Sequence, residues 1–263
     1  MTVSDPTKIA PAGVSQVPER GAYLPEIDIP TPLISVIVPC WRHEDELYRL
    51  VKQLPSSRDV EWISALAEPN PAAVERLEGA GVRCISCSYP SRGEQLNAGA
   101  RVASGQLFVF HHVDSELRAE HLAALRNFVA RSGVNGGAFY RKFDERHPGL
   151  RWAECLERWR CRTFGTLYGD QSIFVTRATF ERLGGFANIP LMEDVEFSTR
   201  LRRNGPVCLL DPPLRTSPVK HLHDGRWRTT ARNFWLQLLY HLGIDPAELH
   251  RWYYRSARVD SPN

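Results

Sequence analysis

Two acidic clusters in this sequence combine side chains that could hold a cation or move a proton. The first, His111-His112-Val113-Asp114-Ser115-Glu116, directly follows an apolar run over residues 107–110. A carboxylate and imidazoles at the end of a strand can bind a divalent cation, which would act as a Lewis acid on a diphosphate. The alternative, which spacing alone leaves open, is a polar turn in which Asp114 caps the next helix.

The second cluster is Met192-Glu193-Asp194-Val195-Glu196. Two adjacent acids at the start of a helix are favoured by the helix dipole. One of them could act as a general base that takes a proton from an acceptor hydroxyl or thiol. Simple capping of the helix is the alternative interpretation.

Three further segments could bind a ligand. Tyr168-Gly169-Asp170-Gln171 offers a glycine for close approach and two side chains that bind sugar hydroxyls, or it is an ordinary turn. The segment from Arg92 to Ala100 offers an arginine and a helix N-terminus to an anion, but it is neither a Walker loop nor a dinucleotide fingerprint. Cys84 and Cys87 have zinc-like spacing, but they would point to opposite faces of a strand, so we expect them to be inert.

Alternating strands and helices must position these segments. Short β-branched or apolar runs alternate with helical periodicity four times, which predicts an α/β fold with a mostly parallel central sheet and flanking helices. Ligands bind beyond the carboxyl ends of strands in such sheets. The predicted strands are 33–38, 60–66, 82–86, 107–111, 136–146 and 171–177, and the predicted helices are 44–54, 72–79, 94–103, 117–130, 193–204, 229–242 and 246–254.

Length and composition predict one soluble domain. The chain has 263 residues and a formal net charge of +3. Residues 1–31 are rich in Pro and Gly without apolar periodicity and predict a flexible lead-in, so 32–263 is expected to form a single domain with C-terminal helices. Residues 1–140 carry 13 basic and 16 acidic side chains, and residues 141–263 carry 20 and 14, so the second half could face an anionic ligand or a membrane surface.

Cysteine usage and the N-terminal residues bear on the compartment. The chain starts without a basic segment followed by an apolar one, so no secretory signal is expected. Six scattered cysteines in a chain of this size are typical of reduced thiols, which predicts a cytoplasmic protein. No apolar run approaches the length of about 20 residues that a membrane helix needs.

The order of the motifs along the chain resembles the inverting family 2 glycosyltransferases, which have the GT-A fold. The resemblance rests on Ile34–Pro39, Arg92…Asn97-Ala98-Gly99-Ala100, His112-Val113-Asp114 and Gly184-Gly185-Phe186…Met192-Glu193-Asp194-Val195-Glu196. From Gly136 onward the sequence is similar to one subgroup, the radical-SAM/selenodomain-associated transferases, some of which are assigned to arsenosugar biosynthesis. The segments that carry this narrower likeness are Gly136–Phe139, Phe143-Asp144, Pro148–Leu150, Tyr168–Val175, Pro190–Asp194 and Arg228–Asn233.

The resemblance implies a nucleotide-sugar donor and a divalent cation, Mg²⁺ or Mn²⁺. By position, Asp194 would be the base of a single displacement, with Glu193 beside it. Asp114 and His112 would hold the metal, and Asp114 would reach the diphosphate. The other residues implied to bind the donor are Pro39, Glu44, Glu68, Arg92, Asn97, Asp170 and Gln171. The implied acceptor is a small molecule or is linked to a lipid; peripheral membrane contact stays open, and nucleic acid is not expected.

The N-terminal half departs from the family pattern. Pro39 is followed by Cys40-Trp41-Arg42-His43, which places Glu44 one residue late. Leu66 occupies the position of the acid that binds the nucleobase, and Glu68 could substitute from two residues away. The alternative function is therefore a degenerate GT-A domain that binds a ligand or partner without transfer. A nucleotidyltransferase would need a glycine-rich loop after the first strand, which is absent here.

Overall fold

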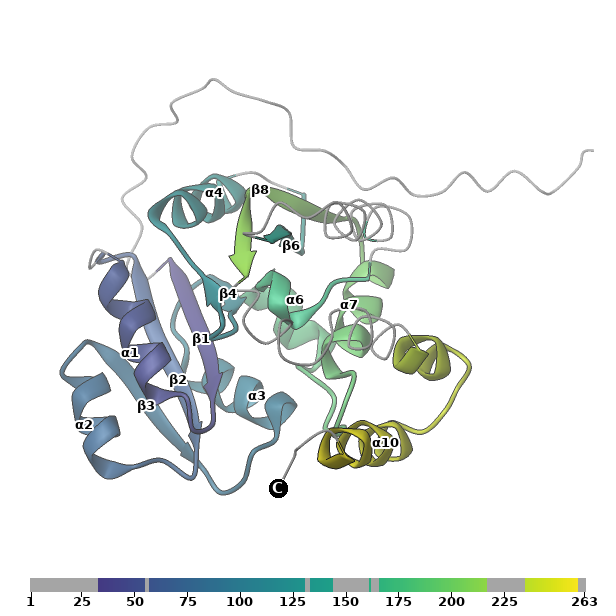
Figure 1. Ribbon diagram of the computed structural model, residues 1–263. Coiled ribbons are helices and arrows are strands. Elements are labelled where there is room, and N and C mark those ends of the chain that lie inside the picture. The colour runs from purple at the N-terminus through teal and green to yellow at the C-terminus, as the bar shows by residue number, and fades with distance from the viewer. Residues whose placement is uncertain are drawn as a thin grey trace, which may run out of the picture.

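The computed structural model describes residues 33–54, 57–130, 133–143, 161, 166–216 and 235–259, with side chains up to residue 253. One eight-stranded sheet, in the order β3-β2-β1-β4-β7-β6-β8-β5, organises the chain (Figure 1). The strands are β1 (Ile34–Cys40), β2 (Val60–Ala67), β3 (Val82–Cys87), β4 (Leu107–Phe110), β5 (Ser115–Glu116), β6 (Gly136–Phe143), β7 (Ile173–Thr176) and β8 (Val207–Thr216).

The first four strands of the sheet run parallel. β1 pairs with β2 on one side and with β4 on the other, and β2 pairs with β3. The second part is mixed, because β7 is antiparallel to β4 and β6, β8 is parallel to β6, and β5 is antiparallel to β8. The predicted α/β class with a mostly parallel sheet is confirmed.

Alternating side chains divide the core between two faces of the sheet. In β4, Leu107 and Val109 join one buried cluster, whereas Phe108 and Phe110 join the other. The first cluster is covered by α1 (Glu44–Gln53), α2 (Pro71–Glu78) and α4 (Ala119–Val129). The second is covered by α3 (Arg92–Val102), α6 (Arg177–Leu183) and α7 (Glu193–Arg203), so helices lie on both faces (Figure 1).

The C-terminal helices form a third, smaller cluster. Residues 235–241 are helical, and α10 (Pro246–Val259) follows. Leu236 and Leu249 pack against Met192 and Val195 at the start of α7. The C-terminal helices therefore brace the same helix end that carries Glu193 and Asp194.

Several predicted elements need correction. The expected strand 171–177 begins only at Ile173, because Gly169–Gln171 forms a 3₁₀ turn, η1. Helix α6, with Thr176 as its cap and Gly184 in the left-handed conformation at its end, was not predicted, and neither was β8. The lead-in 1–31, residues 144–146 of the predicted strand, residues 229–234 of the predicted helix, and the motif segments at 144, 148–150 and 228–233 lie outside the described residues.

Candidate active site

Three segments far apart in sequence meet at the N-terminus of α7. The backbone N–H of Gly169 in η1 donates to Asp194 Oδ2 at 2.7 Å. Arg92 at the start of α3 lies with its Nε 3.4 Å from Glu193 Oε1. The loop after β4 joins them, since the hydroxyl of Ser115 donates to the carbonyl of Asp170 at 3.3 Å. The structure thus brings both predicted acidic clusters to one place.

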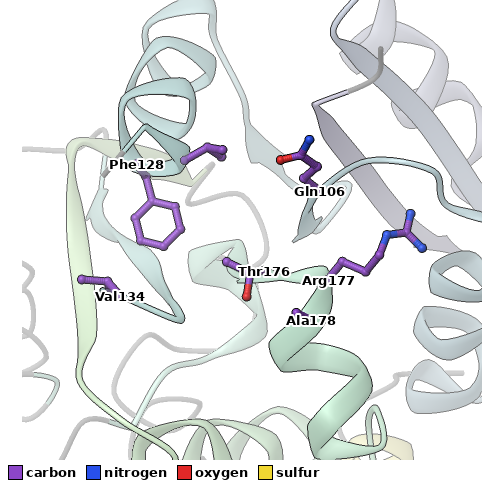
Figure 2. Close-up of a pocket in the computed structure, with 7 residues that line it drawn as sticks. Gln106, Phe128, Val134, Thr176, Arg177 and Ala178 are labelled. Carbon is purple, nitrogen blue, oxygen red and sulfur yellow. The ribbon is translucent and has the colours of Figure 1, made fainter. Parts of the chain in front are cut away.

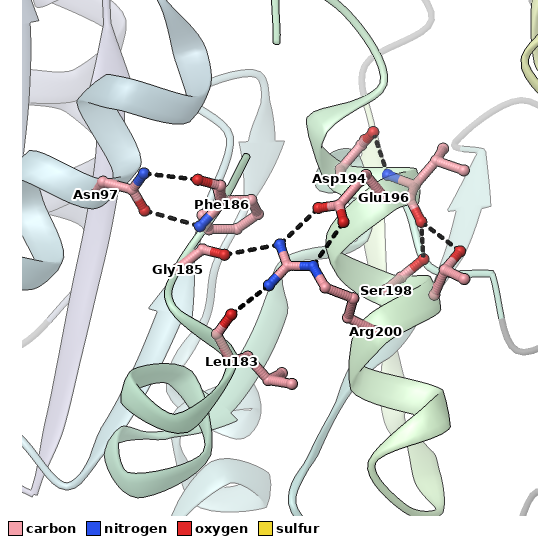
Figure 3. A network of polar contacts seen from close by, with 10 residues as sticks. Asn97, Leu183, Gly185, Phe186, Asp194, Glu196, Ser198 and Arg200 are labelled. Atoms are coloured by element: carbon pink, nitrogen blue, oxygen red, sulfur yellow. Dashed lines mark hydrogen bonds and ion pairs between the residues drawn. The ribbon is translucent and has the colours of Figure 1, made fainter. Parts of the chain in front are cut away.

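Two backbone donors fix the carboxylate of Asp194. Its Oδ2 accepts from Gly169, and its Oδ1 accepts from the N–H of Val195 at 2.8 Å (Figure 3). Because one donor is a backbone group in the first turn of α7 and the other a backbone group of η1, they hold the carboxylate in one orientation. An oriented carboxylate is the geometry that proton abstraction requires.

Glu193 is buried beside Asp194, with 5% of its surface exposed. Burial and the charge of Asp194 together raise the pKa of its carboxyl to about 7, against the guanidinium of Arg92, which lowers it. The site therefore holds a carboxyl group that changes charge near neutral pH.

This raised pKa predicts a pH-dependent contribution to stability. Between about pH 4.5 and 7 the folded state keeps a proton on Glu193 that the unfolded state has released, so this contribution is lost as the pH rises. We expect the unfolding free energy of the wild type to fall relative to that of Glu193→Gln by ~1–3 kcal/mol across this window, as measured by urea unfolding. Glu181→Gln, at a side chain that is 62% exposed, is the control, and equal pH dependence in both variants would contradict the prediction.

The loop after β4 places the predicted metal ligands side by side. The Nδ1 atom of His112 lies 3.5 Å from Asp114 Oδ2, and it accepts a hydrogen bond from the N–H of Asp114 at 3.2 Å. His111 points inward instead: its Nε2 lies 3.0 Å from the carbonyl of Ser115 and its Nδ1 lies 2.6 Å from Ser172 Oγ. Burial lowers the pKa of His111 to about 3, so this histidine is a neutral link between the loop and η1.

The two predicted sugar-binding residues in η1 differ in placement. Asp170 pairs with Arg141 of β6, a charged residue of the site that sequence reasoning missed. Arg141 is followed by Lys142 in β6, so the local sequence gave no signal that set it apart. Gln171 is 1% exposed, and its Oε1 accepts from the N–H of Tyr168 at 2.9 Å, so it stabilises the turn from inside.

Asn97 holds the segment that leads to α7. Its Nδ2 donates to the carbonyl of Phe186 and its Oδ1 accepts from the same residue's N–H, each at 2.9 Å (Figure 3). Arg200 holds the preceding carbonyls of Leu183 and Gly185, at 2.5 and 2.8 Å. Asn97 therefore connects α3 to the segment that precedes Glu193. Both the nitrogen and the oxygen of its side-chain amide bind the backbone of this segment.

The remaining predicted donor residues form a second group at the ends of β1 and β2. Pro39 lies within β1 opposite Ala65, and Glu44 opens α1. Glu68 follows β2 and accepts a hydrogen bond from Trp41 Nε1 at 3.0 Å. Leu66 is fully buried, in agreement with its apolar side chain.

Gln95 of α3 connects this group to the sheet. Its buried amide donates to the carbonyls of Cys40 and Ala65, at 3.0 and 2.7 Å. Arg92, one turn earlier on the same helix, belongs to the acidic group. Helix α3 therefore spans both parts of the candidate site.

A cavity of about 390 Å³ lies elsewhere, near the start of β4 and the end of β7 (Figure 2). Phe128, Val129 and Val134 give it an apolar wall, and Gln106 and Arg177 lie at its edge. Because the amino end of β4 is opposite to the loop that carries Asp114, this cavity is separate from the acidic site.

Comparisons with known proteins show which solved structures have a similar fold. No family model and no curated sequence matches this chain. Among solved structures, it is similar to the mannosyltransferase PcManGT from Pyrobaculum calidifontis in complex with GDP-Man and Mn²⁺, with a TM-score of 0.61, 17% identity and coverage of 82% of this chain and 66% of that one. It is also similar to residues 1–349 of S. aureus TarS in complex with UDP, with a TM-score of 0.56, 16% identity and coverage of 70% and 60%.

This chain has the GT-A fold. At this identity the likeness concerns the fold, and the chain spans 66% and 60% of the two proteins it was compared with. No helix of the described residues is both long and apolar enough to cross a membrane.

The residues present can be tested against the divalent cation that the resemblance to family 2 glycosyltransferases implies. Adjacent ligands of one octahedral cation, each about 2.1 Å from it, lie about 3 Å apart, which is close to the 3.5 Å between His112 Nδ1 and Asp114 Oδ2. Within the described ranges no group of three His, Cys, Asp or Glu side chains could hold a metal. The distance fits one cation whose remaining ligands come from a diphosphate and water, and His112 would bind it through Nδ1 only after releasing the N–H of Asp114.

Proposed function

We propose that this protein is an inverting glycosyltransferase that moves a sugar from a nucleotide-sugar donor to a small-molecule or lipid-linked acceptor. The observation that supports this most is the carboxylate of Asp194, held by two backbone N–H groups beside Glu193 and Arg92. The GT-A fold agrees with the proposal, since the two similar structures contain GDP-Man and UDP.

In the proposed reaction Asp194 takes the proton of the acceptor hydroxyl or thiol. The freed electron pair attacks the anomeric carbon from the face opposite to the diphosphate, and the bond to the nucleoside diphosphate breaks. One displacement inverts the configuration, and the proton ends on Asp194. A divalent cation held by Asp114 and His112 would supply positive charge to the leaving diphosphate.

Other residues are proposed to bind the donor. Asp170, oriented by Arg141, is assigned to the sugar, and Glu44 and Glu68 with Pro39 are assigned to the nucleotide at the ends of β1 and β2. Arg92 completes the proposed donor site, and Asn97 and Gln171, whose amides bind the backbone, would support it from inside rather than contact the donor.

The finer classification is also a proposal. We infer that the chain belongs to family 2 and to the radical-SAM-associated subgroup, on the motifs from Gly136 onward. We propose one domain over 32–263 preceded by a lead-in. Cys40, Cys84 and Cys87 are free thiols, which supports a reducing, cytoplasmic location.

A screen of nucleotide sugars by thermal shift tests the proposal. With Mn²⁺ present, a donor at ~100 times its dissociation constant should stabilise the protein by ~2.7 kcal/mol. Stabilisation by one donor and release of its nucleoside diphosphate with an acceptor extract would support transfer.

The burial of Leu66 favours one alternative, a GT-A domain that has lost transfer. Leucine cannot accept a hydrogen bond from a nucleobase, and an unpaired buried polar group costs ~1–3 kcal/mol. Titration calorimetry with UDP, GDP and CDP in the presence of Mn²⁺ separates the two functions. No binding of any of them would favour the degenerate domain.

A further inference from the structure

Four acidic residues from three segments surround one arginine. Arg92 lies 3.4 Å from Glu193, and its Nε is buried without a hydrogen bond among the described residues. Burial lowers the pKa of Arg92, but the charges of Glu193, Asp194, Asp170 and Asp114 outweigh it and raise the pKa above its usual value. The guanidinium is therefore a fixed positive charge in an acidic site.

A glycine makes room for this guanidinium. A Cβ atom added to Gly169 would overlap Arg92 Nη2 and would lie 2.8 Å from Cζ. Gly169 does not have the positive φ that favours glycine, so its conformation alone would admit a side chain. Volume, rather than backbone freedom, is the reason for a glycine here.

The charges around Glu193 show what Arg92 changes. Asp194 lies next to it on α7 and is the negative charge that acts on Glu193, whereas Asp170 of η1 and Asp114 of the loop after β4 act on Arg92. Arg141 of β6 is paired with Asp170. Arg92 is the cation in contact with Glu193, and without it burial and the neighbouring charge would leave Glu193 protonated.

We propose that Arg92 is a positioning residue that favours the ionised form of Glu193 beside Asp194, and that Gly169 is a glycine because the guanidinium of Arg92 fills the volume of a side chain. This rests on the proposed role of Asp194 as the base. An ionised Glu193 makes Asp194 more basic, whereas a protonated Glu193 could share its proton with Asp194 and weaken it.

The titration of Glu193 tests the proposal without a substrate. Its carboxyl ¹³C signal is assigned as the one lost in Glu193→Gln, and it should titrate near pH 7 in the wild type. In Arg92→Ala the midpoint should rise by ~1 pH unit or more, and Arg92→Lys should restore part of the shift. An unchanged midpoint in Arg92→Ala would overturn the proposal.

Gly169→Ala separates position from charge, because it retains every charged group. Its Cβ should displace the guanidinium and raise the Glu193 midpoint in the same direction as Arg92→Ala. In the Arg92→Ala background the same substitution should add little, since the space is vacant, whereas additive shifts would overturn the steric part. Gly79→Ala, at a helix end with φ −62°, is the matched control and should leave the midpoint unchanged.

If Arg92→Ala does not fold, the Glu193 midpoints of Arg92→Lys and Gly169→Ala test the proposal instead. Unchanged midpoints in both variants would overturn it. The titration reports on Arg92 even if the protein transfers no sugar, so failure of the proposed function and failure of this inference are distinct. Once a donor and an acceptor are identified, the acid limb of the pH profile of kcat in Gly169→Ala should shift to higher pH together with the Glu193 midpoint.

Discussion

Replacing Asp194 by asparagine should lower turnover by about 10²–10⁴-fold, the usual contribution of a positioned general base, and should leave the fold intact. The amide has the size of the carboxylate and its oxygen can still accept one of the two backbone hydrogen bonds from Gly169 and Val195. It cannot take a proton from the acceptor. We therefore expect a loss in kcat, a nearly unchanged donor KM and an unchanged circular dichroism spectrum.

Asp45→Asn is the matched control for this prediction. Asp45 lies on α1 with 66% of its side chain exposed, so the same chemical change there should leave turnover unchanged. Turnover near the wild-type rate in Asp194→Asn would contradict the assignment. In that case Glu193→Gln would show whether the neighbouring acid is the base.

Replacing Asp114 by alanine should remove a carboxylate ligand of the cation at the diphosphate. Metal ions contribute several kcal/mol to such transition states, so turnover should fall by on the order of 10³-fold. Mn²⁺-dependent stabilisation by the nucleoside diphosphate should also disappear from thermal unfolding. The second measurement does not depend on the acceptor.

Two comparisons make the Asp114 experiment specific. Asp114→Glu keeps a carboxylate and should keep part of the Mn²⁺ effect, whereas His112→Ala should weaken metal binding less if the carboxylate is the stronger ligand. Unchanged Mn²⁺ dependence in Asp114→Ala would contradict the proposed metal site and leave the role of Asp194 open.

The parallel half of the sheet could be predicted because its strands are locally consistent. A buried apolar run such as Leu107–Phe110 is interpreted as a strand of a parallel sheet when predicted helices precede and follow it. The spacing of apolar residues predicted the helix boundaries. Strand β8 was not predicted because its sequence contains Pro212 and Pro213, and proline cannot donate a hydrogen bond to a neighbouring strand. Its pairing with β6 depends on tertiary contacts.

The acidic residues of the site could be found from sequence, but their partners could not. A carboxylate after a strand or at a helix start carries a local signal, as Asp114 and Asp194 did. Asn97 and Gln171 have amides that suit a ligand and a backbone equally; a segment 89 positions away binds Asn97, whereas Gln171 binds Tyr168 within its own turn. Arg141 pairs with Asp170 across 29 positions of the chain, which no local pattern encodes.

The same long separations determine when the site can form during synthesis. Gly169 binds Asp194 across 25 positions, and Asn97 binds Phe186 across 89. Contacts of such high sequence separation form late in folding because loop closure must precede them. A nascent chain that ends before α7 therefore contains Arg92 and Asp114 but lacks the assembled candidate site, which forms only when the last third of the chain has folded onto the first.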